Sequence, residues 1–140
     1  MRGVVGYVPG VFDLFHVGHL DVLRRAAAGC DRLVVGVLSD EAAEAAYGTR
    51  PVVPLIERLE IIANVRDVAR AVPLDDPAPL AALDELGFAV LFCGHEPPLP
   101  GLDALADREV RVERFDGVAE TGSAALRAAL RDGSPRTSVA

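Results

Sequence analysis

The chain alternates short apolar runs, rich in β-branched residues, with stretches whose apolar residues recur at helical spacing. This alternation is typical of a parallel sheet whose strands are joined by helices. It predicts a single-domain α/β fold over residues 1–131, a Rossmann-like parallel sheet with helices on both faces. The tail 132–140 is polar and rich in turn residues, and we expect it to be disordered. The expected strands are about 4–8, 32–38, 69–72, 89–93 and 110–115, and the expected helices are about 19–28, a short one capped by Ser39, 55–64, 77–86 and 123–131.

Composition and charge narrow the class of protein. The apolar runs are about five to seven residues long, well short of the roughly 18 that a membrane span needs, and the N-terminus lacks a signal-peptide pattern. We therefore expect a cytoplasmic protein without a membrane partner. The net charge of −7 argues against nonspecific binding to nucleic acid. All 14 basic residues are arginine, so arginines must supply any positive charge that holds a phosphate group.

Ligands of open parallel sheets bind at the carboxyl ends of the strands, close to the point where the strand order reverses. In the predicted fold, four loops should meet at this edge. They are residues 9–19, 39–50, 94–101 and 117–123.

The first of these loops ends in His16-Val17-Gly18-His19, which contains two of the three histidines of the chain. The loop delivers both imidazoles to the start of a predicted helix, where unpaired backbone N–H groups attract anions. Two histidines at this spacing could also bind a metal, but a metal site needs further ligands, and none lies close in sequence. The spacing alone leaves a phosphate site and an ordinary structural role both open.

The longer run from Gly10 to His19 resembles the signature Gly-x-Phe-Asp-x-x-His-x-Gly-His of the cytidylyltransferase family, and is closest to glycerol-3-phosphate cytidylyltransferase-like proteins. Leu38-Ser39-Asp40-Glu41 is similar to the turn after the second strand of that family, and the segment 50–58 is similar to its substrate loop and the helix that follows. The resemblance implies a nucleotidyltransferase that uses a nucleoside triphosphate with Mg²⁺ and forms a homodimer.

Residue roles follow from the same resemblance. Asp13 would orient its loop or hold a metal through water. For Arg58 the alternative is a solvated helix charge paired with Glu57 or Glu60, since such surface pairs are common. The implied catalytic residues are His16, His19, Arg58 and Arg114; the implied nucleotide-binding residues are Gly10, Val11, Phe12, Asp13, Gly18, Gly94, His95, Thr121 and Ser123; the implied acceptor-binding residues are Tyr47, Arg50 and Glu96.

Two segments depart from the family pattern. The family has about Arg-Thr-x-Gly-Ile-Ser-Thr after its last strand, whereas here Arg114 and Gly117 are kept and the hydroxyls come later, at Thr121 and Ser123. Either hydroxyl could cap the last helix or contact a phosphate. The family commonly has Gly-Asp-Asp-Trp where this chain has Gly94-His95-Glu96-Pro97. These changes leave the acceptor open.

Three hypotheses follow. The first is transfer of CMP from CTP to a small phosphorylated alcohol similar to glycerol 3-phosphate, with release of pyrophosphate. The alternative is an adenylyltransferase of the same superfamily that acts on a sugar or flavin phosphate. The third is a noncatalytic nucleotide-binding protein, which the displaced hydroxyls and the missing lysines would explain.

Overall fold

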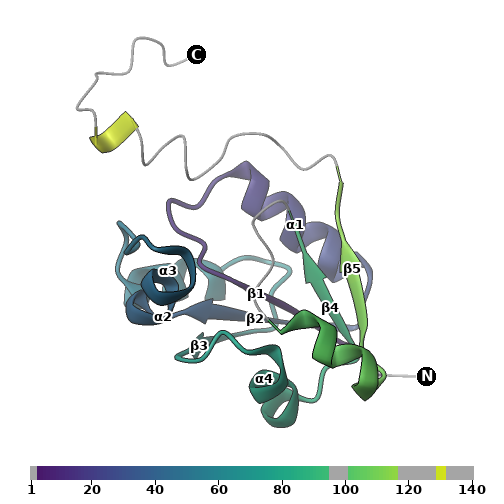
Figure 1. The fold of residues 1–140 in the computed structure, drawn as a ribbon. Helices are drawn as coiled ribbons and strands as arrows, with labels where there is room; N and C mark the ends of the chain where they lie inside the picture. Colours follow the sequence, from purple (N-terminus) through teal and green to yellow (C-terminus); the bar gives the residue numbers. More distant parts are fainter. Residues whose placement is uncertain (1–2, 95–100, 117–128, 132–140) are drawn as a thin grey trace.

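The computed structural model describes residues 3–94, 101–116 and 129–131. Its centre is a sheet of five parallel strands in the order β3-β2-β1-β4-β5 (Figure 1). This confirms the predicted Rossmann-like α/β fold. The strands are β1 Val5–Gly10, β2 Arg32–Leu38, β3 Arg70–Leu74, β4 Val90–Cys93 and β5 Arg111–Arg114, and the helices are α1 Val17–Ala28, α2 Asp40–Tyr47, α3 Leu55–Ala63, α4 Pro79–Leu86 and the 3-10 helix η1 Leu102–Arg108.

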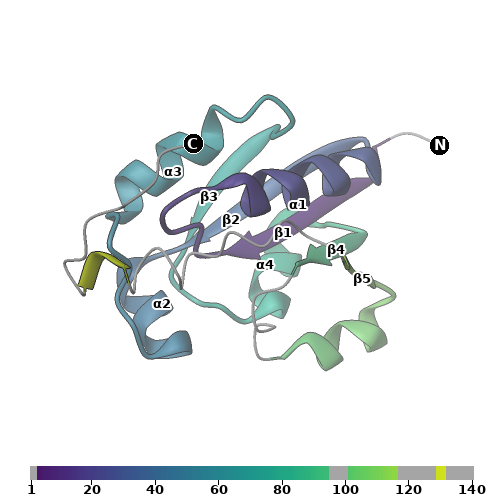
Figure 2. The same ribbon diagram turned by 90° about the horizontal axis from the view of Figure 1, so that it is seen from above.

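Helices cover both faces of the sheet, as predicted. Figure 2 shows α1 and α3 over one face, while α4 lies on the other. Leu23 of α1 and Ile62 of α3 pack with Val35 and Phe92 in the larger core, and none of these four side chains is exposed. Leu105 of η1 belongs to the core of the opposite face, together with the following residues: Tyr7, Val34, Ala82, Phe88, Leu91 and Val110. Because β2 is covered on both sides, its apolar run is continuous rather than alternating.

Some predicted boundaries were wrong. The strand expected to end at residue 72 continues through Pro73 to Leu74. Proline lacks the N–H that a central strand would use, but β3 lies at an edge of the sheet, where one side needs no partner. η1 was not expected at all. Of the last predicted helix, only 129–131 is described, and it is helical, whereas the tail 132–140 lies outside the described residues.

The strand order places β1 at the point where the order of the strands along the sheet reverses. The chain runs outward from β1 through β2 to β3, and then returns to the other side of β1 to form β4 and β5. The loop that follows β1 therefore lies at the switch point, at the carboxyl edge of the sheet, where ligands of this fold class bind. In the described part of the chain, no helix is long and apolar enough to cross a membrane.

Candidate functional site

Helix α1 begins with an unusual cap made by the two histidines. His16 is the N-cap residue, and its Nδ1 accepts a hydrogen bond from the backbone N–H of Gly18 at 3.0 Å. In return, Nδ1 of His19 accepts from the backbone N–H of His16 at 3.3 Å. The helix was expected to begin at His19, but it begins at Val17, so both imidazoles belong to its first turn. The pair satisfies two N–H groups that a helix start otherwise leaves unpaired.

This cap fixes the tautomer of both imidazole rings. A ring nitrogen that accepts a hydrogen bond carries no proton, so in this geometry each neutral imidazole has its hydrogen on Nε2. The two rings stack with centroids 3.9 Å apart. The helix start therefore carries two stacked imidazoles, inclined by 25° to each other, each with an Nε2–H donor.

The loop before the helix packs closely around His19, which is only 7% exposed. The rings of Phe12 and Phe15 each lie 5.5 Å from its centroid, the first edge-on and the second stacked. Gly10 makes room for this packing, because a Cβ at that position would lie 2.9 Å from the Phe12 ring. The side chain of His19 is thus held from two sides.

Asp13 lies in the same loop and is buried. Its two carboxylate oxygens accept hydrogen bonds from the backbone N–H groups of Val52 and Val53, each at 2.9 Å. This use of both oxygens favours the loop-orienting role over a metal-binding one. Among the described residues, no group of three or more His, Cys, Asp or Glu side chains could hold a metal ion.

Arg58 is buried in the protein interior, and its side chain has no exposed surface. The expected alternative, a solvated charge paired with Glu57 or Glu60, is wrong, because its ion-pair partner is Asp40 at 2.6 Å. It makes four hydrogen bonds to protein acceptors: the carbonyls of Val11 (2.8 Å), Leu38 (2.8 Å) and Val53 (2.7 Å) and the Asp40 carboxylate (2.6 Å). These contacts join the ends of β1 and β2 to the start of α3.

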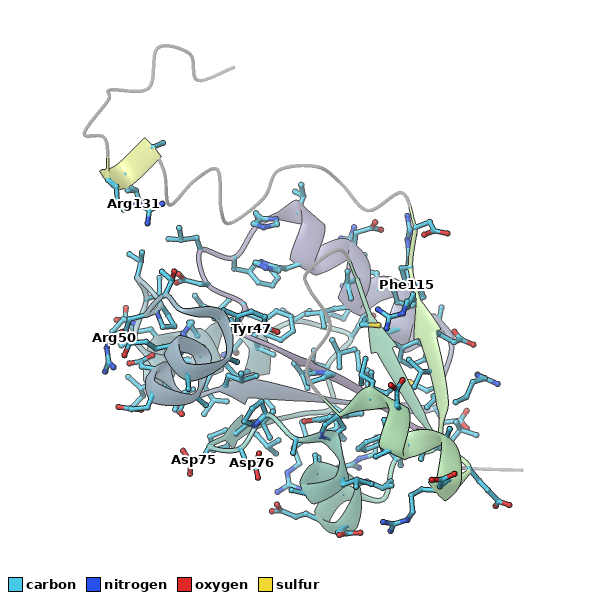
Figure 3. The ribbon with its side chains drawn as sticks, in the orientation of Figure 1. Tyr47, Arg50, Asp75, Asp76, Phe115 and Arg131 are labelled. Atoms are coloured by element: carbon cyan, nitrogen blue, oxygen red, sulfur yellow. The ribbon has the colours of Figure 1, made fainter. Side chains whose placement is uncertain are left out.

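The residues implied in acceptor binding lie around α2. Arg50 is half exposed and lies near three carboxylates of that helix, Asp40 at 3.8 Å, Glu41 at 3.4 Å and Glu44 at 3.8 Å. Tyr47 packs against the small core of Leu38, Ala42 and Ala43. Figure 3 shows Arg50 at the outer rim of the molecule and Tyr47 nearer to the sheet. An anion that binds Arg50 must compete with these carboxylates.

The carboxyl ends of β4 and β5 form the other part of this edge of the sheet, and the structure describes only some of their residues. Gly94 follows β4 and lies so close to α1 that a Cβ there would be 2.7 Å from Cγ2 of Val22. Arg114 ends β5 on the face opposite to α1, where it borders an open hollow of about 530 Å³ beside η1. Burial raises the pKa of the neighbouring Cys93 thiol, an effect that the Arg114 charge reduces. His95, Glu96, Thr121 and Ser123 lie outside the described residues.

Sequence reasoning missed the part that Asp40 takes in the site. Asp40 was noted only as part of the turn after the second strand, whereas its carboxylate contacts both Arg58 and Arg50. A signal was present in the next helix. Leu55, Arg58 and Ile62 recur at the spacing of one helix face, so an arginine stands within the inward stripe. A charge in such a stripe indicates a buried partner.

Comparisons with known proteins identify the family of the chain. A family model described as cytidylyltransferase-like matches residues 7–121. The bifunctional protein HldE of Rhodospirillum rubrum is 34% identical over 95% of this chain, and that of Acidiphilium cryptum is 40% identical over 64% of it. The chain spans only 28% and 19% of the length of these two relatives.

A solved structure of a lipopolysaccharide core biosynthesis protein from Thermoplasma volcanium has the same fold. It matches with a TM-score of 0.72 over 81% of this chain and 96% of its own, at 24% sequence identity. The family match covers the histidine cap, the buried Arg58 and the whole described edge of the sheet. Since the match extends over more than half of the sequence, the chain belongs to the cytidylyltransferase-like family of nucleotidyltransferases.

Proposed function

We propose that this chain transfers an adenylyl group from ATP to a sugar phosphate, with release of pyrophosphate. The observation that carries the proposal is the histidine cap of α1, which presents two Nε2–H donors at the switch point of the sheet. Donors and a helix N-terminus at this place suit the charged oxygens of a triphosphate.

The choice of base and acceptor rests on the relatives. The sequence alone put cytidylyl transfer to a glycerol-phosphate-like alcohol first. The similarity to HldE proteins favours the alternative, an adenylyltransferase that acts on a sugar phosphate. The chain spans less than a third of those relatives, so the proposal concerns the nucleotidyl-transfer step alone.

In the proposed reaction, an oxygen of the acceptor phosphate attacks the α-phosphorus of the triphosphate. The bond from that phosphorus to the bridging oxygen of the β-phosphate breaks, and pyrophosphate leaves with the electron pair. Negative charge grows on the phosphate oxygens in the transition state, so catalysis depends on positioning and on hydrogen-bond donors. His16 and His19 would donate these bonds through Nε2, and no protein nucleophile is needed. Mg²⁺ would arrive bound to the triphosphate.

The remaining roles stay proposals as well. Val11 and Gly18 would let the backbone approach the triphosphate, and Gly94, His95, Thr121 and Ser123 would complete the nucleotide side. Arg114 borders the hollow on the opposite face of the sheet and has no part in this proposal. Tyr47, Arg50 and Glu96 would face the acceptor. A homodimer, which light scattering would detect, and a cytoplasmic location are two further expectations that stay predictions.

Pyrophosphate release tests the proposal. The purified protein with Mg²⁺ is given ATP or CTP, each with a panel of sugar phosphates and with glycerol 3-phosphate. We expect the fastest release with ATP and one of the sugar phosphates. Release with CTP and glycerol 3-phosphate alone would instead support cytidylyl transfer, and nucleotide binding without release from any pair would support the noncatalytic hypothesis.

The matched variant is His16→Asn. Asparagine is a good N-cap and its side-chain oxygen can still accept from Gly18, but it lacks the Nε2–H group. We expect kcat to fall by about 10²- to 10³-fold, the usual effect of losing one transition-state donor. A variant with unchanged kcat would show that His16 serves the helix and takes no part in the reaction.

A further inference from the structure

The loop between β1 and α1 has a strained backbone. Phe12 and Leu14 have φ values of 56° and 51°, in the left-handed region that non-glycine residues avoid. Asp13 lies between them. A strained conformation of this kind persists only where the surrounding structure holds it, and such strain gathers at functional sites.

The Asp13 carboxylate holds the loop from one side. Its two bonds to the N–H groups of Val52 and Val53 tie the strained turn to the segment that precedes α3. Asp13 is only 1% exposed, so solvent does not compete strongly for these bonds.

The Arg58 guanidinium holds the loop from the other side. Its Nε donates to the carbonyl of Val53, and its Nη1 donates to the carbonyl of Val11. The peptide groups of Val53 are therefore bound at both ends, with the N–H on Asp13 and the C=O on Arg58. The contacts close a ring that runs from Asp13 through Val53 and Arg58 back to Val11.

We propose that Arg58 and Asp13 are positioning residues. This closed ring keeps Phe12 and Leu14 in their left-handed conformations, and so sets the position of His16 and His19 relative to a bound triphosphate. The inference rests on the proposed function. It differs from the role that the family resemblance implies, because Arg58 acts here through the loop and not by touching a phosphate.

Only arginine has the geometry for this task. Its planar fork carries five N–H donors, which here reach four acceptors on the ends of two strands, a loop and a helix. A lysine at this position would keep the charge and the Asp40 partner but would lose the fork. Arg58→Lys therefore tests whether the site needs the planar fork of the guanidinium or only its positive charge.

The experiment compares Arg58→Lys and Asp13→Asn with a control, Arg108→Lys, whose arginine forms an exposed pair with Asp84 away from the site. We expect both site variants to lower kcat by about 10- to 100-fold, the effect of a small misplacement of catalytic groups. KM for the triphosphate should change much less. The control should keep the kcat of the unaltered protein.

The second readout is the imidazole ¹⁵N spectrum of His16 and His19. In the unaltered protein, both Nδ1 atoms should give the signal of an unprotonated acceptor. In the site variants, mixed or shifted signals should show that the cap is no longer held. Arg108→Lys should leave the spectrum unchanged.

The outcomes decide between a positioning and a merely structural role. Folded site variants with lower stability, full kcat and an unchanged spectrum would overturn the proposal. If Arg58→Lys does not fold, Asp13→Asn decides by the same criteria. If the unaltered protein transfers no nucleotidyl group, the proposed function fails, and the imidazole spectrum alone then supports or overturns the positioning of the histidines.

Discussion

Glu109 adopts a backbone conformation that suits glycine better than glutamate. It ends η1 with a φ of 60°, and its side chain is exposed. A non-glycine residue in this region costs about 1–2 kcal/mol of stability. Glycine avoids this cost, but part of the gain is offset because glycine loses more conformational entropy on folding. We expect Glu109→Gly to raise the free energy of unfolding by about 0.5–1 kcal/mol, measured by urea denaturation. Glu109→Ala is the control, and an equal gain from alanine would contradict the explanation.

Tyr7 makes the stability depend on alkaline pH. Burial, helped by the charge of Glu85, raises the pKa of its hydroxyl above the ordinary value near 10. The folded state therefore favours the neutral phenol, and this stabilisation is lost as the pH rises above about 10, where the unfolded chain ionises first.

Tyr7→Phe removes this ionisation and keeps the stacked contact with Phe88, at 4.5 Å between centroids. Between pH 9 and pH 11, the unaltered protein should lose about 1.4 kcal/mol more unfolding free energy than the variant. The difference between the two denaturation curves isolates Tyr7 from the two cysteines, whose pKa values are also raised by burial. Parallel curves over this range would show that the phenol does not ionise differently in the two states.

At this scale the sequence predicted the histidine pair better than the arginine. His16 and His19 belong to a contiguous motif, so their meeting at the helix start needs only local geometry. Arg58 depends on the carbonyls of Val11 and Leu38, which lie 47 and 20 residues away in the chain. Backbone acceptors leave no mark in a sequence, and for this reason these two carbonyl partners could not be predicted.

The contact between α1 and the end of β4 depends on a missing side chain. A Cβ at Gly94 would lie 2.7 Å from Cγ2 of Val22, and Val22 is 8% exposed with little room to move. We expect Gly94→Ala to destabilise the protein by about 1–3 kcal/mol, the usual cost of overpacking.

A double-mutant cycle with Val22→Ala tests that prediction. The smaller side chain makes room for the new methyl group, so the cost of Gly94→Ala should be clearly smaller in the Val22→Ala background. The free energies of unfolding of the four proteins give the coupling. Additive costs would show that the close approach at Gly94 is not the source of the effect.

Elements with long apolar patterns were predicted best. β2 was predicted with both ends correct, because its run is continuous and is followed by the Ser39 cap, whose Oγ accepts from the N–H of Ala42. The 3-10 helix η1 has only seven residues and follows a proline-rich segment, so its apolar residues are too few to establish a period. In α3, Ile56 is 76% exposed despite its apolar side chain, because the buried stripe of the helix runs through Arg58 and Ile62.

We expect local unfolding of the sheet to begin at its edge strands. Among the described residues, β1 is paired on both sides, whereas β3 and β5 are edge strands with one partner each. We expect amide hydrogens of β1 and β2 to exchange most slowly, and those of β5, with four residues, to exchange fastest among the strands. NMR-detected exchange at neutral pH measures this order, and protection of β5 equal to that of β1 would contradict it.

The sequence predicted the fold class because the alternation of strands and helices restricts a chain to few topologies. The strand order was left open, since connections of similar length can lead to either side of β1. The geometry of the candidate site could be predicted where it is local, in the loop after β1. Its contacts with Asp40 and with the peptide groups of residues 52–53 could not be predicted, because they form only when the fold places three separate segments at one edge of the sheet.

The return of the chain to β4 divides the sheet into two contiguous halves, residues 5–74 and 79–114. The halves are joined across the sheet by β1 and β4, whose register pairs only Gly6 with Val90 and Tyr7 with Leu91. Because the histidine cap belongs to the first half and Gly94 to the second, a ligand that contacts both would link the two halves across the β1–β4 interface. Substrate binding would then stabilise this short interface. The amide hydrogens of β4 and β5, which are remote in sequence from the histidines, should become better protected from exchange.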